Sequence, residues 1–367
     1  MREDFWFDSC GAGKIHVYRW MPEGEPKAVF QIVHGIAEVA ERYDAFAQVL
    51  AQRGFVVVAD DHMGHGQSVG EGDTKGYFTG GWFSAVADSY HLLELTKAEY
   101  PNLPYILFGH SMGSFMARTI LCKYPDSGID AAIICGTGWQ PAFALPVVIK
   151  VVESVCKKVG ETNPDETLHK LVFGGYNRKV EHPRTEFDWL TRDARIVDAY
   201  IAHPMCGFTE TTGLLRDLMT GIRYIEKPES LAAMRKELPV FFIAGGDDPV
   251  GNYGKGVRQS ADAFRKAGMA DVSVHIYPLC RHEILNEINR EEVYGDILQW
   301  LSSHMKKSSP RRRFGIGGDT GFTVFDLEAK YTVDPNTFKT KGRATPFAGR
   351  EVFGECVLTV YGGQGII

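Results

Sequence analysis

The sequence predicts an α/β fold in which a mostly parallel β-sheet carries helices on both faces. Three observations support this prediction. Short continuous apolar runs, such as FVVVAD at 55–60, are typical of strands buried on both faces of a parallel sheet. Stretches with apolar residues at helical spacing separate these runs, as parallel connections require. The alternation stops between about 138 and 225, where helical patterns occur without a clear strand, and then resumes.

The predicted elements follow the chain in a regular order. Strands are short apolar or alternating runs, expected at 14–20, 28–33, 55–60, 105–109, 131–136, 238–245 and 272–278. Helices have apolar positions every three or four residues, expected at 41–54, 84–101, 114–125, 254–268 and 288–304. A sheet interrupted by a helical insertion after about its sixth strand is the simplest architecture that fits this order.

Composition changes after residue 305, which places a domain boundary there. The run KKSSPRRR at 306–313 combines like charges with Ser and Pro, as linkers do. The residues that follow are rich in Gly and in strand-forming stretches such as EVFGECVLTVYGG. We therefore predict five segments: a core part at 1–137, a helical insertion at 138–225, a second core part at 226–305, a basic linker at 306–315, and a β-rich C-terminal extension at 316–367.

The composition describes a mildly acidic globular protein. The chain has 367 residues, 44% of them hydrophobic, and a formal net charge of −6, so we expect no nucleic-acid partner. Its seven cysteines show no metal-ligand spacing, which favours reduced thiols and no metal. The N-terminus lacks a signal-peptide pattern, and the most apolar stretch, 142–155, is too short to span a bilayer. We expect a cytoplasmic protein.

The strongest chemical signal is GHSMG at 109–113, which fits G-x-S-x-G between a predicted strand and a predicted helix. Such a turn is so sharp that it holds the serine, Ser111, in a strained conformation. Side chains at Gly109 and Gly113 would collide with neighbouring backbone. The hydroxyl of Ser111 then lies at a helix N-terminus, where amides favour developing negative charge. A chance match is the alternative, but the flanking strand and helix favour a nucleophile at Ser111.

A serine nucleophile needs a histidine base, which in this architecture follows a late strand. His282 comes a short loop after the strand at 272–278 and precedes a helix, so we predict it to be the base. His275 lies inside that strand, and His304 lies on the last helix. Three further histidines fall in the insertion, where we expect surface positions: His169, His182 and His203.

The orienting acid should follow the strand at 238–245, in the stretch IAGGDDPVG. Asp247 and Asp248 are the two acids there, and the residues alone leave both open, because an Asp before Pro is also an ordinary start of a helix. Pro249 biases Asp248 toward extended backbone. That bias fits a residue that both starts a helix and orients the base.

The oxyanion of an acyl-transfer reaction needs two backbone N–H groups. One should come from the residue after the nucleophile, Met112, and the other from the loop after an early strand. The loop after 28–33 begins His34-Gly35-Ile36, and we predict Ile36 as the second donor, with Gly35 allowing a close backbone approach. The alternative is that His34 and Gly35 form an ordinary turn at the end of a strand.

Four motifs in this order resemble the monoacylglycerol lipase and lysophospholipase branch of the α/β-hydrolases, over about residues 10–305. They are HGIAEVAERYDAFAQVLAQRGFVVVADDHMGHGQS at 34–68, then GHSMGS, GGDDPVG and RHEILNE. The resemblance implies an α/β-hydrolase fold with the nucleophile at Ser111 and the base at His282. Its acid motif, G-x-x-D, falls on Asp248. Its H-G-x-x-E…R-Y pattern matches His34, Gly35, Glu38, Arg42 and Tyr43.

The resemblance also implies a role for the insertion and includes one departure. The insertion at 138–225 corresponds to a cap over the active site. The apolar helix near 145–155 could line an acyl channel, touch a lipid surface transiently, or pack on the core, and its valines suit each equally. The departure is Met63, where the family usually has Arg, so the charge pairing made by that arginine is absent here.

The extension resembles a different protein, because residues of about 319–363 are similar to the C-terminal end of bacterial dihydroorotases. The metal ligands of that family lie in its barrel, and this chain contains no H-x-H, so the extension should not bring that activity. It could form a homodimer contact, cover the hydrolase, or be passive. The basic run at 306–313 fits a solvated linker better than a phospholipid or nucleic-acid surface.

Together these features predict a serine hydrolase of carboxylic esters that needs no cofactor and acts on a small ester or lipid. Fold does not fix substrate. A peptidase, a thioesterase and a cofactor-free haloperoxidase on the same scaffold therefore stay open. So does a protein of another class, which would bind a small apolar ligand without turning it over.

Overall fold

The computed structural model describes residues 1–140, 145–305, 322–334, 348–361 and 364–365. The chain divides into two compact units, Met1–Lys307 and Ser308–Ile367. The predicted linker lies outside the described residues.

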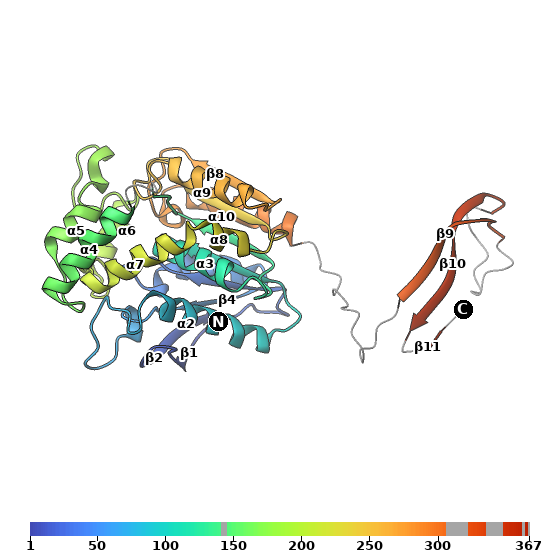
Figure 1. Ribbon diagram of the computed structural model, residues 1–367, viewed down its shortest axis with the longest axis horizontal. Helices are drawn as coiled ribbons and strands as arrows, with labels where there is room; N and C mark the ends of the chain where they lie inside the picture. Colours follow the sequence, from blue (N-terminus) through green and yellow to red (C-terminus); the bar gives the residue numbers. More distant parts are fainter. Residues whose placement is uncertain (141–144, 306–321, 335–347, 362–363, 366–367) are drawn as a thin grey trace. The chain divides into compact units, whose positions relative to one another are not determined.

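The first unit, drawn from blue to orange in Figure 1, is built on an eight-stranded sheet. The order of its strands is β1-β2-β4-β3-β5-β6-β7-β8. The strands are β1 (Arg2–Asp8), β2 (Lys14–Trp20), β3 (Ala28–Val33), β4 (Phe55–Asp60), β5 (Tyr105–His110), β6 (Ala131–Cys135), β7 (Val240–Gly245) and β8 (Val272–Tyr277). Pairing is antiparallel at β1–β2 and β2–β4 and parallel from β4 to β8. The predicted α/β class is confirmed.

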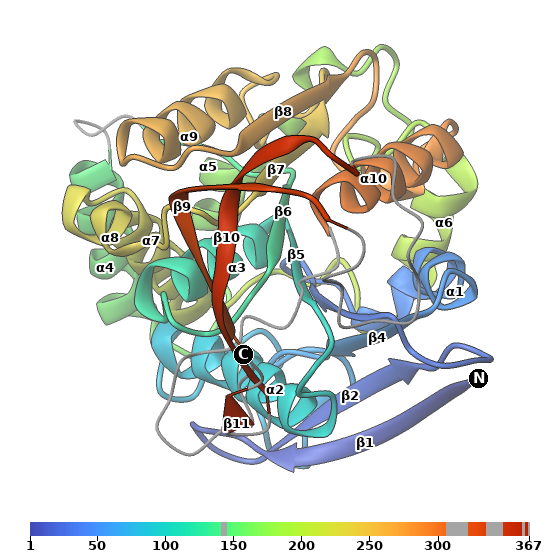
Figure 2. The ribbon, with the colours of Figure 1, turned by 90° about the vertical axis from the view of Figure 1, so that its right-hand side faces the viewer.

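Helices cover both faces of this sheet (Figure 2). On one face lie α1 (Asp44–Gln52) and α10 (Arg290–His304), and on the other α2 (Trp82–Glu99), α3 (Met112–Lys123) and α9 (Lys255–Lys266). Successive residues of the central strands alternate between the two cores, as strand geometry requires. In β3, for example, Phe30 and Ile32 pack toward α1 and α10, whereas Val29 and Val33 pack toward α2 and α3.

The register of the parallel strands gathers four loops at one edge of the sheet. Val33 lies opposite Gly109, and Gly245 lies opposite Tyr277. The loops that follow β3, β5, β7 and β8 therefore emerge side by side, at the carboxyl ends of the strands. This edge is where ligands bind in open α/β sheets.

Between β6 and β7 the chain forms helices and, among its described residues, no strand. We call residues 138–225 the cap. Its helices are α4 (Leu145–Val159), α5 (Glu166–Phe173), α6 (Ala194–Ala202) and α7 (Thr212–Ile225), and α8 (Pro228–Ala233) follows. Side-chain caps begin three of them: Asp165, Asp193 and Thr211 accept from Leu168, Arg195 and Leu214, respectively. No helix in the described residues is long and apolar enough to cross a membrane.

The second unit contains a three-stranded antiparallel sheet in the order β11-β10-β9. Its strands are β9 (Phe322–Thr332), β10 (Glu351–Tyr361) and β11 (Gln364–Gly365). The pairing of β9 with β10 shifts register between Phe353 and Glu355, as at a bulge. The strand-prone composition of the extension thus corresponds to strands.

Candidate active site

Ser111 occupies a sharp turn between β5 and α3. Its backbone angles, φ 54° and ψ −122°, lie far from those of the flanking strand and helix. A Cβ on Gly109 would approach the Gly113 carbonyl oxygen to 2.3 Å, and one on Gly113 would approach the Val33 oxygen to 2.0 Å. Any side chain at either glycine would therefore force the backbone apart. Ser111 is 9% exposed and lines the cavity described below.

His282 and Asp248 meet below the same cavity. The His282 Nδ1 atom lies 3.0 Å from Asp248 Oδ1, and the two side chains are 2% and 0% exposed. The two atoms are close, but their geometry does not meet that of a hydrogen bond. The Val250 N–H donates to the same Asp248 oxygen over 2.9 Å. Asp247 is exposed, so the structure brings Asp248 and not Asp247 to His282.

The loop after β3 lies against the serine turn. A Cβ on Gly35 would be 3.1 Å from Ser111 Cβ, which shows how closely the two backbones approach. Gly35 and Ile36 line the cavity beside Ser111, and Met112 begins α3. His34 is buried behind this loop, where its ring stacks on His62 at 3.8 Å. Burial, with the neighbouring His62, brings the pKa of His34 well below its usual value.

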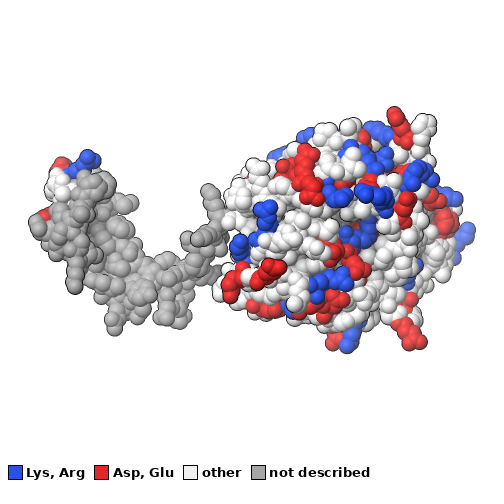
Figure 3. All heavy atoms as spheres, turned by 180° about the vertical axis from the view of Figure 1, so that it is seen from behind, with Lys and Arg blue, Asp and Glu red and all other residues white. Residues whose placement is uncertain are grey.

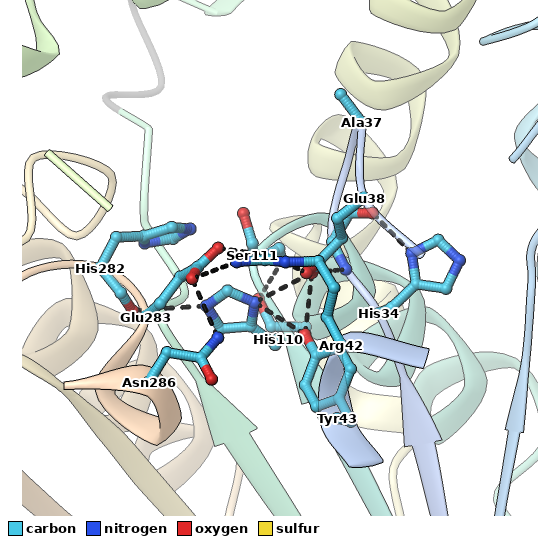
Figure 4. A network of polar contacts seen from close by, with 12 residues as sticks. His34, Ala37, Glu38, Arg42, Tyr43, His110, Ser111, His282, Glu283 and Asn286 are labelled. Carbon is cyan, nitrogen blue, oxygen red and sulfur yellow. Dashed lines mark hydrogen bonds and ion pairs between the residues drawn. The ribbon is translucent and has the colours of Figure 1, made fainter. Parts of the chain in front are cut away.

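A buried charged network connects this loop with the residue after His282 (Figure 4). The Arg42 guanidinium donates to both oxygens of Glu283 over 2.6 Å and to Glu38 Oε2 over 2.6 Å. Glu38 Oε1 in turn accepts from the Gly35 N–H and the Tyr43 hydroxyl, over 2.6 and 2.8 Å. Burial alone would raise the pKa of Glu38, but the contact with His110 and the charge of Arg42 bring it well below its ordinary value.

Hydrogen bonds connect the cap directly to the loop that carries His282. The His282 N–H donates to the Trp189 carbonyl over 3.3 Å, and the Glu283 N–H donates to the Leu190 carbonyl over 2.7 Å. Further along, the buried carboxylate of Glu287 accepts from the Arg192 side chain over 2.9 Å and from the Arg281 N–H over 2.8 Å. This part of the cap is thus fixed to the base, whose ring contacts the rings of Trp189 and His110 at centroid distances of 5.1 and 4.6 Å.

A cavity of about 610 Å³ lies between the core and the cap. Its size is that of a typical site for a small organic ligand. Ser111, Ile36 and His282 line it from the core, and much of the remaining wall comes from the cap. The aromatic residues of that wall are Phe173, Phe187, Trp189, Tyr200 and Phe208. Its charged or titratable residues are Glu166, His169, Lys170, Glu186 and Glu210.

His169 was expected at the surface, and its side chain is instead only 20% exposed. His169 lines the cavity, and its Nδ1 atom lies 2.7 Å from Glu210 Oε2. The hydrogen bond to Glu210 raises the pKa of His169. Periodicity could not reveal this contact, because Glu210 lies 41 residues further along the chain, just before the start of α7.

The structure also locates the other residues that the sequence analysis considered. His275 is exposed on β8, whereas His304 stacks on Trp300 of α10. Met63, which stands where the resemblance led us to expect Arg, is buried in the core.

Among the described residues, no group of three or more His, Cys, Asp or Glu side chains is placed to hold a metal ion. Figure 3 shows acidic and basic side chains interspersed over one face of the first unit.

Comparison with known proteins identifies the class. Residues 24–289 match the model of the family described as Serine aminopeptidase, S33. The human Monoglyceride lipase is 39% identical over 290 residues, 77% of this chain and 85% of that protein. The Monoacylglycerol lipase of Mycolicibacterium smegmatis is 28% identical over 83% of this chain and 98% of that protein. The chain belongs to the Serine aminopeptidase, S33 family, and it is an α/β-hydrolase enzyme of the esterase and lipase type.

Structural comparison agrees with this assignment. A thermostable carboxyl esterase from Bacillus coagulans, solved in complex with glycerol, superimposes with a TM-score of 0.77 at 28% identity, covering 82% of this chain and 98% of that one. A separate match of 71 residues, 32% identical, is to Dihydroorotase from Lactobacillus acidophilus and covers 18% of this chain and 17% of that protein. So small a share of that protein leaves the role of the C-terminal extension a prediction.

Proposed function

We propose that this enzyme hydrolyses small carboxylic esters, monoacylglycerols among them, through Ser111, His282 and Asp248. The observation that carries the proposal is the strained Ser111, which faces the same cavity as a histidine whose Nδ1 atom lies 3.0 Å from a fully buried carboxylate. A nucleophile, a base and an orienting acid in this arrangement are what acyl transfer requires.

In the acylation step, the Ser111 oxygen attacks the ester carbon while His282 Nε2 takes the hydroxyl proton. The Asp248 carboxylate stabilises the imidazolium, and the N–H groups of Ile36 and Met112 stabilise the oxyanion. The bond to the alcohol then breaks, and His282 gives its proton to the leaving oxygen. Water next attacks the acyl-enzyme as His282 takes one of its protons. The acid is released when that proton returns to Ser111.

The cavity supports an amphipathic substrate. Its cap wall combines aromatic rings with charged groups. The rings would cover an acyl chain, and the charged groups would bind an alcohol that carries several hydroxyl groups. The glycerol named in the B. coagulans structure and the glycerides named for the relatives support the same substrate class.

Contact with a lipid surface is a further part of this proposal. On α4, Ile149 and Val152 are buried, whereas Val147 and Val151 are 62% and 41% exposed with Lys150 between them. One apolar side of this helix thus packs inward, and a second apolar strip remains outside. Exposed apolar side chains near a cationic one suit shallow contact with a bilayer surface.

The test compares the full chain with Ser111→Ala, using 4-nitrophenyl butyrate and a long-chain monoacylglycerol as substrates. We expect a loss of at least about 10³-fold in kcat for Ser111→Ala. A fluorophosphonate should label the wild type and spare the variant, and Ser302→Ala, on the exposed end of α10, serves as the matched control. Hydrolysis or labelling that survives in Ser111→Ala would refute the proposal, and an unlabelled wild type would favour a binding protein.

A peptidase is the second candidate, favoured by the description of the matching family as a serine aminopeptidase. Aminoacyl 4-nitroanilides and 4-nitrophenyl esters with the same acyl group would separate the two candidates. Turnover of the anilides at a rate equal to or above that of the esters would favour the peptidase.

A further inference from the structure

Ala37, the residue after the expected oxyanion donor Ile36, has an unusual backbone conformation. Its φ angle is +53°, in the left-handed region, where the Cβ of an L-residue is crowded by the backbone. Ala37 is also 3% exposed, so solvent does not support this conformation. Such a conformation persists when neighbouring groups hold it in place.

Three hydrogen bonds hold Ala37 at both ends. Its N–H donates to His65 Nε2 over 3.3 Å, and its carbonyl oxygen accepts from the Tyr200 hydroxyl and the Gly207 N–H, each over 2.9 Å. His65 belongs to the core, in the loop after β4, whereas Tyr200 and Gly207 belong to the cap. The turn beside the serine is therefore held from the core on one side and from the cap on the other.

His65 is suited to accept this bond. Its Nδ1 atom lies 3.1 Å from the Met63 carbonyl oxygen, so the ring carries its proton on Nδ1 and leaves Nε2 as an acceptor. The ring is enclosed by Phe78 and Phe208, with centroids at 5.9 and 5.5 Å. Burial, with the charge of His62, lowers the pKa of His65 to about 4, which keeps the acceptor form at neutral pH.

We propose that His65 and Tyr200 are positioning residues that hold Ala37 so that the preceding Ile36 N–H faces the developing oxyanion. This inference rests on the proposed function, because it takes Ile36 as a donor of the oxyanion hole. It assigns the cap a second task besides enclosing substrate, since α6 helps to shape the site of charge development. Loss of either contact should lower kcat while leaving KM nearly unchanged, because the oxyanion forms in the transition state.

Tyr200→Phe is the mildest test, because it removes the hydroxyl and keeps the ring that packs on Phe187 and under Arg42. The matched control is Tyr105→Phe, which also removes a buried hydroxyl bond, to Gln31 over 2.8 Å, but inside the sheet. With 4-nitrophenyl acetate, whose acyl group needs no cap contact, we expect Tyr200→Phe to lose about tenfold in kcat, a fraction of what deletion of an oxyanion donor costs. KM should stay within about twofold, and Tyr105→Phe should keep wild-type kcat.

Glycine at position 37 tests whether backbone conformation is the cause. Gly adopts positive φ without a Cβ penalty, so Ala37→Gly should restore most of the kcat lost in Tyr200→Phe while changing the wild type little. On the core side, His65→Gln keeps an acceptor and His65→Leu removes it, so activity should be higher in the glutamine variant.

The outcomes separate this inference from the proposed function. A wild type that hydrolyses esters through Ser111, with a Tyr200→Phe variant that keeps its kcat within twofold, would overturn the inference alone. So would a loss in Tyr200→Phe that Ala37→Gly fails to reverse, because the effect would then be general destabilisation. An active Ser111→Ala would overturn the proposed function itself, whatever the behaviour of Tyr200.

Discussion

Replacing each acid of the Asp247-Asp248 pair by asparagine would identify the partner of His282. Asn has the shape of Asp without its charge, so Asp248→Asn removes the electrostatic support for the imidazolium and keeps the packing. The two groups lie 3.0 Å apart. At an effective dielectric constant of about 20, the lost attraction is about 5.5 kcal/mol. That energy corresponds to a decrease of about 10⁴-fold in kcat for Asp248→Asn.

Asp247→Asn is the matched control, because it alters the adjacent residue in an exposed position. The Asp247 N–H, which donates to the Cys280 carbonyl over 2.9 Å, is unaffected by this substitution. We expect kcat within about twofold of the wild type, as for most exposed polar changes. Steady-state hydrolysis of 4-nitrophenyl butyrate gives the rates, and thermal unfolding of each variant shows whether it is folded.

Two results would refute this reasoning. A large loss in Asp247→Asn with little change in Asp248→Asn would reverse the assignment. Equal small losses in both folded variants would show that no acid on this loop supports the base.

Three further predictions concern stability, lipid contact and the extension. In the folded state His65 stays neutral, with a pKa of about 4, whereas in the unfolded chain a histidine takes up a proton below about pH 6.5. Lowering the pH therefore favours the unfolded state, and the free energy of unfolding should fall by about 2 kcal/mol from pH 7 to pH 5 through this residue. Urea unfolding should show a smaller fall in His65→Gln, and an identical fall would contradict the attribution. Replacing both Val147 and Val151 by serine should reduce the fraction of protein that sediments with phosphatidylcholine vesicles and leave 4-nitrophenyl acetate hydrolysis intact. Unchanged vesicle binding would exclude α4 as the helix that contacts the lipid. A chain ending at Met305 should keep its esterase kcat and differ from the full chain in solubility or oligomeric state by light scattering, whereas identical behaviour would indicate a passive extension.

The strands of the parallel sheet could be predicted from the sequence because they are buried on both faces. Such burial requires continuous apolar runs like FVVVAD, and β4 occupies the expected residues, Phe55–Asp60. The edge strand β1, REDFWFD, was not predicted. Most of its side chains are exposed at the margin of the sheet, so it has no apolar run to mark it. The short helix α8 was also missed.

The candidate site was predictable where a motif carries its own geometry, as GHSMG does. Contacts between distant segments were not predictable in this way. Arg42 and Glu283 are 241 residues apart, and neither residue has a pattern that indicates the other. The motif RHEILNE contained the signal in part, because it places two acids close to His282. The burial of Asp248 and the exposure of Asp247 emerge from the folded loop, which turns one carboxylate inward.

The backbone hydrogen bonds between Trp189–Leu190 and His282–Glu283 make this stretch of the cap part of the support of the base. If this side of the cap moved away, the base would lose its own backbone support. An exchange of the cap that preserves the active arrangement should therefore leave this stretch in place. The segment from Trp189 to Arg192 and the α6 residue Tyr200 should be kept with the core.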